Sequence, residues 1–233
     1  MVIGIVVIAV AVIICFLLAV ANYSGERFFE KYEKLNKEIV SVNMSSLDFV
    51  ANINKKYFEN SLVIKRTEVK AGDAYAKGIL ILSNETLSTP SLASFTIISH
   101  ELGHAKQDKE GNTLKHFNRL RRLGRFLGAF LMPLLLSGGI IMLLAENLFY
   151  LGLGLVCGGG LIFLISLFMK LKTISIEKQA STYAVDFLNE YLSQEELRKC
   201  KIFLKDARLT YWADFLRALF FWTFLTKSSK LFS

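Results

Sequence analysis

Three long stretches of the chain are almost purely apolar, and they dominate the pattern of hydrophobic and polar positions. They cover residues 2–21, 126–144 and 148–168, and none of them contains Asp, Glu, Lys or Arg. A helix of about 20 residues, rising roughly 1.5 Å per residue, crosses a hydrocarbon core of about 30 Å. Charged side chains are costly at the centre of a bilayer. The pattern therefore predicts three membrane-spanning helices.

The first stretch has an alternative interpretation as a cleaved signal peptide. Ala19-Val20-Ala21 has the small residues that signal peptidases favour, but no Lys or Arg precedes Arg27. A secretory signal normally begins with a basic segment. We therefore expect residues 1–21 to be a retained transmembrane anchor.

Basic residues gather at one end of each apolar stretch. The loop between the second and third stretches, residues 145–147, contains no basic residue, and its single charged residue is Glu146. Loops rich in Lys and Arg stay in the cytoplasm, which predicts an outside N-terminus and an outside loop at 145–147. The basic positions are Arg27, Lys31, Lys34, Lys37, Lys115, Arg119, Arg121, Arg122, Arg125, Lys170, Lys172 and Lys178.

The net charge of +8 follows from these flanks. We interpret it as membrane topology and contact with anionic lipid head groups. No aromatic residues alternate with the basic ones in the way that nucleic-acid-binding segments show, so a nucleic-acid partner is not expected. The lipid bilayer is the expected partner instead.

Removing the spans leaves two cytoplasmic pieces that together are long enough for one compact domain. We expect a mainly α membrane protein with a small β-hairpin or sheet, in which a cytoplasmic domain is split by a transmembrane helical hairpin. The expected segments are an anchor at 1–21, the first part of the domain at 22–125, the hairpin at 126–169, and the second part at 170–233.

Local patterns predict the elements of both pieces. In the first piece they are a helix through 28–39, a helix capped at Ser45-Ser46, a strand at 62–70, a returning strand at 78–82, and a helix that starts at Thr89-Pro90 and ends near 110–112. In the second piece they are helices at 173–188 and 193–205. The segment 209–225 suits an interfacial or core helix better than a fourth span.

The sequence His100-Glu101-Leu102-Gly103-His104 is the strongest chemical signal. On a helix, His100 and His104 lie one turn apart on the same face, where two imidazoles can bind one Zn²⁺. Glu101 is displaced by about 100° around the helix, so it can act as a catalytic base without being a ligand. Histidine pairs also occur on surface helices without metal, but this chain has only 3 histidines in all.

A catalytic zinc site normally has three protein ligands and an open position. The zincins with a longer motif would need Gly at position 107 and His at position 110, where this chain has Gln107 and Glu110. That class is therefore excluded. His116 is one option for the third ligand, and a glutamate from a later helix is the other.

Glu177 is the favoured glutamate. The two spans between His104 and Glu177 return the chain to the same side of the membrane, as a shared site requires. Small residues at Ala180 and Ser181, opposite Gly103, would let the two helices approach closely. The competing carboxylates, farther along the chain, are Glu190, Glu195 and Glu196.

Ser88-Thr89-Pro90-Ser91-Leu92-Ala93-Ser94, followed by the His-Glu-x-x-His helix and Ala105-Lys106-Gln107, resembles the YugP-type neutral zinc metallopeptidases. The order of parts is similar too: a span, the zinc helix, a two-span hairpin, and a Glu-x-x-Ala-Ser helix. Residues 79–83 resemble the strand that precedes the zinc helix in that family. The resemblance covers about residues 1–190. Lys178-Gln179 departs from the family pattern, and residues 22–56 are only loosely similar.

The resemblance implies peptide-bond hydrolysis with Zn²⁺ as cofactor. We expect a membrane-anchored zinc endopeptidase with Glu101 as base, acting on peptide or protein substrates that are membrane-associated, because the spans closely flank the site. The alternative is a non-catalytic membrane protein whose zinc site supports assembly. A transporter is disfavoured because the spans lack ionisable residues. Glycines at 138–139 and 158–160 suit close helix packing, within the hairpin or in a homo-oligomer.

Several supporting roles are assigned by residue type alone. His116 and Tyr183 are candidates for stabilising the oxyanion, and Ser181 and Asp186 for orienting the histidines. The strand at 78–82 is a candidate edge strand that pairs with an extended substrate, or else an ordinary hairpin strand.

Overall fold

The computed structural model describes residues 2–111, 131 and 133–219. The chain divides into two compact units, one made of residues 1–112 and 174–233 and the other of residues 113–173. Helices dominate, and one sheet of three strands accompanies them. The predicted mainly α architecture with a small sheet is therefore confirmed. His116, the basic stretch 115–125 and residues 126–130 lie outside the described residues.

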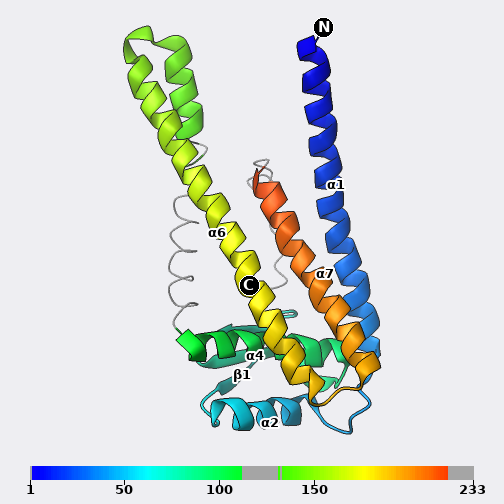
Figure 1. The fold of residues 1–233 in the computed structure, drawn as a ribbon. Helices are drawn as coiled ribbons and strands as arrows, with labels where there is room; N and C mark the ends of the chain where they lie inside the picture. The colour runs from blue at the N-terminus through cyan, green and yellow to red at the C-terminus, as the bar shows by residue number, and fades with distance from the viewer. Residues whose placement is uncertain (1, 112–130, 132, 220–233) are drawn as a thin grey trace. The chain divides into compact units, whose positions relative to one another are not determined.

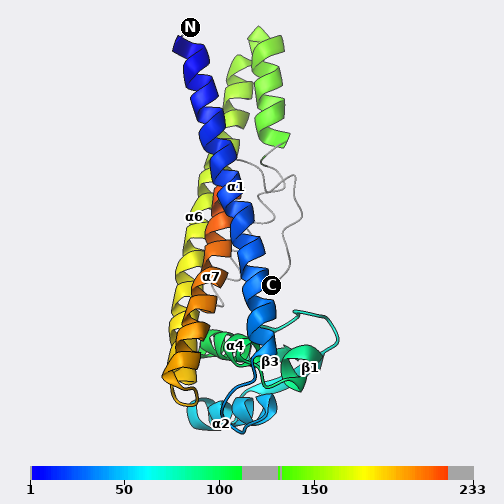
Figure 2. The ribbon, with the colours of Figure 1, turned by 90° about the vertical axis from the view of Figure 1, so that its right-hand side faces the viewer.

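Helix α1 (Val2–Lys37) is continuous from the first apolar stretch through the charged segment that follows it. In the same unit it runs alongside α7 (Gln194–Leu219), as both Figure 1 and Figure 2 show. The ring of Phe28 stacks on that of Phe203 at 5.1 Å, and the Lys31 ammonium pairs with the buried carboxylate of Asp206. The sequence predicted a separate interfacial or core helix at 209–225. Residues 209–219 of that segment belong to α7, which extends through Leu219.

Helix α2 (Ser46–Phe58) begins where its sequence predicts. The Ser45 hydroxyl accepts a hydrogen bond from the Asp48 N–H at 3.1 Å, which satisfies one of the free donors at the helix start. The helix ends at Phe58, and the next residue, Glu59, has a φ of 55°, the left-handed conformation common after helix ends. The predicted cap at Ser45-Ser46 is therefore confirmed.

The sheet has the strand order β1-β3-β2. Strand β1 (Val63–Thr67) pairs with β3 (Ile79–Ser83) in parallel, and β2 (Ala74–Ala76) pairs with β3 antiparallel. The hairpin partner of β3 is thus β2, which joins it through Lys77 and Gly78, both with positive φ as in a type I′ turn. The strands expected at 62–70 and 78–82 are present as β1 and β3 and pair with each other, but they run parallel and not antiparallel, because the connection between them contains the additional strand β2.

Of the two interpretations of the strand at 78–82, the strand order confirms an ordinary hairpin strand and contradicts a substrate-pairing edge strand. β3 has a hydrogen-bonded neighbour on each side, so residues 79–81 are not an open edge strand. The Ser83 N–H is also hydrogen-bonded, because it donates to the buried carboxylate of Asp73 at 2.8 Å. An extended peptide therefore has no free backbone donors on this strand.

Helix α4 (Leu92–Gly111) follows the short α3 (Asn84–Ser88) and lies at the centre of the first unit. Its predicted start at Pro90 was early, because the Pro90 carbonyl accepts the Val40 N–H at 3.0 Å and holds that residue outside the helix. Ser91 caps the helix instead, accepting the Ser94 N–H at 3.1 Å. Its end at Gly111 agrees with the prediction.

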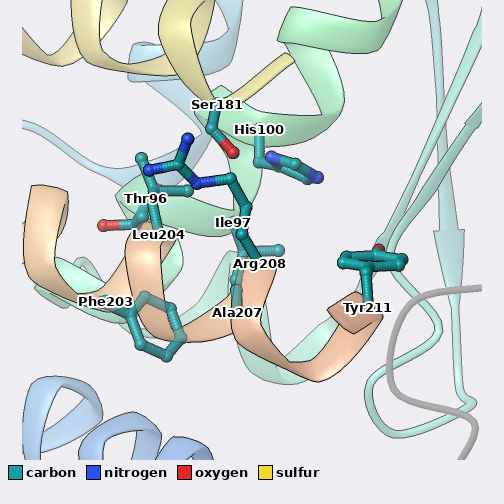
Figure 3. A pocket seen from close by; sticks show the side chains of 9 residues that line it. All are labelled: Thr96, Ile97, His100, Ser181, Phe203, Leu204, Ala207, Arg208 and Tyr211. Carbon is teal, nitrogen blue, oxygen red and sulfur yellow. The ribbon is translucent and has the colours of Figure 1, made fainter. Parts of the chain in front are cut away.

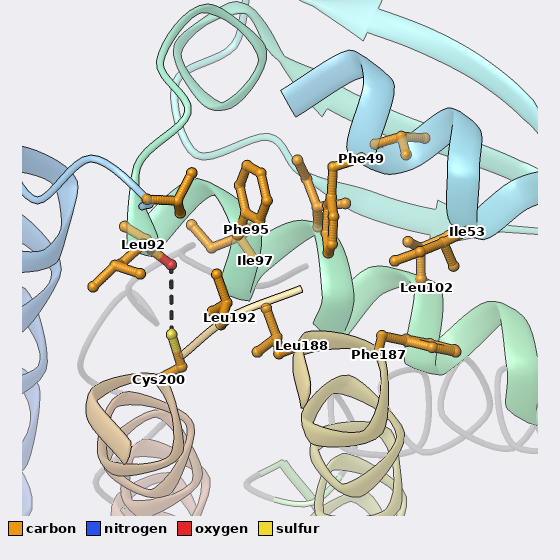
Figure 4. Packing of buried hydrophobic residues seen from close by; sticks show 14 of the residues in the cluster. Phe49, Ile53, Leu92, Phe95, Ile97, Leu102, Phe187, Leu188, Leu192 and Cys200 are labelled. Atoms are coloured by element: carbon orange, nitrogen blue, oxygen red, sulfur yellow. Dashed lines mark hydrogen bonds between the residues drawn. The ribbon is translucent and has the colours of Figure 1, made fainter. Parts of the chain in front are cut away.

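The hydrophobic core surrounds α4 (Figure 4). Phe95 stacks on Phe49 of α2 at 4.1 Å between ring centroids, and Leu102 is fully buried. On another side, the Cys200 thiol of α7 approaches the Leu92 carbonyl at 4.0 Å. A helix enclosed in this way holds its side chains in fixed positions, which is what a metal site requires.

Helix α6 (Phe149–Asn189) follows a short 3₁₀ turn, η1 (Glu146–Leu148). Of the described residues, the helical stretch Glu146–Asn189 is long and apolar enough to cross a membrane, with a mean hydropathy of 2.3 in its most apolar window. A shorter apolar helix covers Pro133–Leu144. Within the second unit, a Cβ on Gly138 would lie 2.7 Å from the Gly152 carbonyl oxygen, so Gly138 permits close packing there.

Candidate metal centre

Three side chains of the first unit converge on one point. His100 and His104 come from α4, and Glu177 comes from the last part of α6. The Nε2 atoms of the two histidines lie 3.1 and 3.4 Å from the same Glu177 oxygen, Oε2. Of the described residues, this is the group of His, Cys, Asp and Glu that could hold a metal ion.

The spacing of these atoms suits zinc. With metal–ligand bonds of about 2.0–2.1 Å and tetrahedral angles, neighbouring ligand atoms should lie about 3.4 Å apart. One candidate ligand atom from each of the three residues lies within 4.8 Å of the other two. Two imidazoles and one carboxylate are a donor set that zinc hydrolases use. The residues present therefore fit a zinc ion.

Close packing of α4 and α6 brings the ligands together. A Cβ built on Gly103 would lie 2.4 Å from the Ala180 carbonyl oxygen, closer than real Cβ atoms approach. Only a residue without a side chain fits at this crossing. The predicted close approach of Gly103 to Ala180 is confirmed, and it explains why the third residue after His100 is glycine.

Charge inside the site favours a cation there. Burial would raise the pKa of Glu177, but hydrogen bonds from His100 and His104 outweigh it and hold that pKa well below its usual value. Burial likewise would lower the pKa of His104, yet the hydrogen bond and charge of Glu177 raise it to about 9. The negative charge of Glu177 therefore favours a positive charge between the two imidazoles, which a metal ion would supply when bound.

Glu101 lies on α4 between the two histidines and is only 5% exposed. Burial raises the pKa of its carboxyl group, although the nearby His104 and His100 act in the opposite direction. A general base works best when its pKa approaches the working pH. The environment of Glu101 thus suits proton transfer.

An apolar recess reaches the site from α7 (Figure 3). Tyr211 and His100 both line it, from helices on either side. Burial raises the pKa of Tyr211 well above its usual value, and the charges of Glu177 and Glu101 add to this effect. The hydroxyl therefore stays protonated and can donate a hydrogen bond. The full lining is Thr96, Ile97, His100, Ser181, Phe203, Leu204, Ala207, Arg208 and Tyr211.

The other carboxylates that compete with Glu177 are engaged elsewhere. Glu190 accepts a hydrogen bond from Lys56 at 2.8 Å. Glu196 accepts the Ser41 N–H at 2.7 Å, and Glu195 lies 3.4 Å from the Lys199 ammonium. None of these contacts is with a histidine of the motif.

The supporting residues expected from sequence lie in different places. The Ser181 hydroxyl donates to the Glu177 carbonyl at 2.8 Å, and Asp186 is exposed. The Tyr183 hydroxyl donates to the carboxylate of Glu110, near the end of α4. The oxyanion and orienting roles of these three residues stay predictions.

Sequence reasoning missed two residues at the site, Gln107 and Tyr211. The Gln107 Oε1 atom lies 2.9 Å from Nδ1 of His104. Its position three residues after His104, on the same helix face, is a signal that the sequence does contain. Tyr211 has no such local signal, because α7 joins the site only through the tertiary fold.

Two histidines one turn apart, a glutamate between them and a glutamate from a second helix are the residue pattern of many zinc-dependent hydrolases. The chain belongs to the family described as "Putative neutral zinc metallopeptidase", whose model matches residues 5–227. Zinc is the metal that this family implies.

The chain is also similar to a curated protein that is named as a protease. The chain is 25% identical over 205 residues to the "Putative membrane protease YugP" of Bacillus subtilis (strain 168), and the match covers 86% of each protein. No solved structure matches the chain.

Proposed function

We propose that this chain is a membrane-bound zinc endopeptidase whose reaction takes place at the centre formed by His100, His104 and Glu177. The observation that carries the proposal is the convergence of both histidines on one oxygen of Glu177, 77 positions away from His100 in the chain. The family supports zinc-dependent peptide hydrolysis, and the relative in Bacillus subtilis supports a membrane location.

Each residue has a distinct role in this proposal. Zinc, when bound there, supplies a Lewis acid that polarises the scissile carbonyl and makes water more acidic. Glu101 takes a proton from the attacking water and gives it to the leaving amine as the C–N bond breaks. Its raised pKa suits both transfers, because the same carboxyl group has to accept a proton and then release it. The Tyr211 hydroxyl donates to the oxyanion that develops on the carbonyl.

The proposal includes a topology. Residues 2–21 anchor the chain, 126–169 form a two-span hairpin, and the hairpin divides a zincin-like cytoplasmic domain into 22–125 and 170–233. The N-terminus and the loop at 145–147 lie outside. Support comes from the apolar stretches and their basic flanks, and from α6, whose apolar half leads directly into the segment that carries Glu177.

The first experiment combines zinc content with a peptide-cleavage assay on the full chain purified in detergent. Wild type should hold about one zinc per chain and cleave a quenched-fluorescence peptide library. The Glu101→Gln variant should keep the zinc and lose cleavage, and Glu177→Ala should lose the zinc. Glu195→Gln, an exposed glutamate on α7, is the matched control and should behave like wild type. Zinc retained without any cleavage would favour the non-catalytic assembly role and contradict the proposal.

The proposed substrate class is a peptide presented at the bilayer. The same cleavable sequence can be offered to the full chain in lipid vesicles as a soluble peptide and as a peptide fused to a transmembrane anchor. The anchored form should be cleaved with a kcat/KM at least about tenfold higher, because both partners are confined to one surface. Equal kcat/KM values for the two forms would contradict this substrate class.

A further inference from the structure

The side chain of Gln107 has every hydrogen-bonding atom engaged. It is 5% exposed. Its Nε2 donates to the Ile176 carbonyl at 2.8 Å and to Gln179 Oε1 at 3.0 Å, both on α6. Because the two N–H groups of the amide meet acceptors, its oxygen has to face His104 Nδ1, 2.9 Å away. An amide oxygen can only accept, so His104 must carry its hydrogen on Nδ1.

This arrangement fixes the tautomer of His104. With the hydrogen on Nδ1, the lone pair of the neutral ring lies on Nε2, the atom that points toward Glu177. A ligand histidine in zinc proteins typically donates its other ring N–H to an acceptor that orients it. Gln107 is such an acceptor, and it is held in place by α6, the helix that carries the third ligand.

The hydrogen bonds continue beyond Gln107 in one direction. Gln179 Nε2 donates to the Tyr183 hydroxyl at 3.2 Å, and that hydroxyl donates to the Glu110 carboxylate. Each group accepts from the preceding one and donates to the next, and the series ends on a carboxylate, which only accepts. We call His104, Gln107, Gln179, Tyr183 and Glu110 the polar chain. It passes from α4 to α6 and back again.

Gln179 has a structural role in the polar chain. In the sequence alone, Gln179 has no evident role. In the structure, Gln179 supplies the acceptor that one Gln107 N–H needs and passes the hydrogen bonds on toward Tyr183. A side chain without an acceptor at this position would leave that N–H of a buried amide without its partner.

We propose that Gln107 and Gln179 are positioning residues for the metal centre, which hold His104 in its ligand tautomer and tie it to the helix of Glu177. The inference rests on the zinc centre of the proposed function and not on peptide cleavage. It predicts that their loss weakens zinc binding even when the chain stays folded. Outer partners of ligand histidines typically contribute about 10- to 100-fold in metal affinity.

Zinc affinity of the full chain in detergent is the first readout, measured by competition with a chromogenic chelator. Gln107→Met keeps the length of the side chain but has no amide, and its Kd should rise about 10- to 100-fold. Gln179→Met should raise the Kd by a smaller factor, and Gln179→Glu should restore it, because a carboxylate still accepts from Gln107. Gln194→Met, at the exposed start of α7, is the control and should leave the Kd unchanged.

The second readout is the tautomer itself. Selective ¹⁵N labelling of histidine gives few signals, because the chain has 3 histidines. Zinc-loaded wild type should show His104 with a slowly exchanging hydrogen on Nδ1, and Gln107→Met should exchange that hydrogen quickly. Since Gln179 is exposed, Gln179→Met tests the inference even where Gln107→Met does not fold.

The outcomes separate this inference from the proposed function. Unchanged Kd values and an unchanged Nδ1 hydrogen in folded Gln107→Met and Gln179→Met would overturn the positioning role, whether or not the chain cleaves peptides. A wild-type chain that binds zinc but cleaves nothing, with the expected order of Kd values, would contradict the proposed function and support the positioning role.

Discussion

At the scale of single residues, neighbouring side chains of the site are expected to have different roles, some in metal binding and others in the reaction. His100, His104 and Glu177 share one point, so removing any of them should weaken metal binding. Glu101 and Tyr211 lie beside that point without belonging to the ligand group, so removing either should harm the reaction much more than metal binding. Measuring zinc affinity and turnover separately therefore distinguishes the two kinds of residue.

Tyr211→Phe tests the proposed oxyanion donor. The substitution removes one hydroxyl and keeps the ring that lines the recess beside His100. We expect kcat to fall about 10²- to 10³-fold, as when other enzymes lose one such donor, while the zinc Kd changes by a much smaller factor, although the hydroxyl also contacts Glu177. Steady-state kinetics with a fluorogenic peptide and chelator competition measure the two quantities. Tyr57→Phe, which removes a hydroxyl bound to the Glu190 carboxylate outside the polar chain, is the comparison and should retain the higher kcat. Equal kcat values for the two variants would exclude Tyr211 from the reaction.

Glu196 illustrates a carboxylate with a structural role. Burial would raise its pKa, but hydrogen bonds from Ser193 and Ser41 outweigh this and lower it to about 2. Because the folded pKa lies below the usual 4.5, the ionised form stabilises the fold. That stabilisation is complete above about pH 4.5 and is lost as the pH falls toward about 2.

Glu196→Gln should therefore destabilise the chain in a pH-dependent way. At pH 7 we expect the free energy of unfolding to fall by about 1–3 kcal/mol, the usual contribution of hydrogen bonds to a charged group. The difference from wild type should shrink progressively below pH 4.5. Denaturant titrations in detergent at several pH values measure it, with exposed Glu195→Gln as control. A constant difference from pH 7 down to pH 3 would contradict the assigned pKa.

At the scale of helices and strands, the crossing of α4 and α6 controls the site. Gly103→Ala would place a methyl group 2.4 Å from the Ala180 carbonyl oxygen, so the helices would have to separate. We expect a loss of about 1–3 kcal/mol in unfolding free energy and weaker zinc binding, since the ligands sit on both helices. Gly25→Ala, where nothing lies within 4 Å, is the control and should be neutral or stabilising by up to about 1 kcal/mol. Wild-type zinc affinity in Gly103→Ala would contradict the role of this crossing.

The elements that sequence predicted well are those with local chemical signals. Ser45 caps α2 through its own side chain, and the histidine motif lies on a helix that ends at Gly111. The sequence failed where tertiary contacts decide. Strand β2 has three residues, too few for an alternating pattern, and Pro90 is kept out of α4 by a hydrogen bond from Val40.

In the candidate site, too, the residues with local sequence signals could be predicted, and those placed by tertiary contacts could not. The spacing of His100, Glu101 and His104 is a property of any helix, so the sequence alone predicts their relative positions. Glu177 was found by a topological argument, because two spans return the chain to the same side. Gln179 and Tyr211 could not be predicted, because their roles depend on how α6 and α7 pack against α4, which no local spacing encodes.

At the scale of the whole molecule, the site constrains how the chain crosses the membrane. His104 and Glu177 lie in one compact unit, while residues 113–173 between them form another. If the intervening segment crosses the bilayer, it must cross an even number of times, or the two ligands would lie on opposite sides. The apolar stretches 126–144 and 148–168 supply two crossings, with Glu146 in the turn between them.

Cysteine labelling on intact cells tests this topology with a membrane-impermeant maleimide. The native chain provides the background, because Cys15 and Cys157 fall within predicted spans and Cys200 is buried. Glu146→Cys should react on intact cells, since the proposed turn faces outside. Glu59→Cys, on an exposed position at the end of α2, should react only after the cells are permeabilised. Reaction of both positions only after permeabilisation would mean that residues 126–168 do not cross the bilayer, although both ligands would still share one side. Reaction of Glu59→Cys on intact cells would place the metal centre outside, and the basic flanks would then not have set the orientation of the chain.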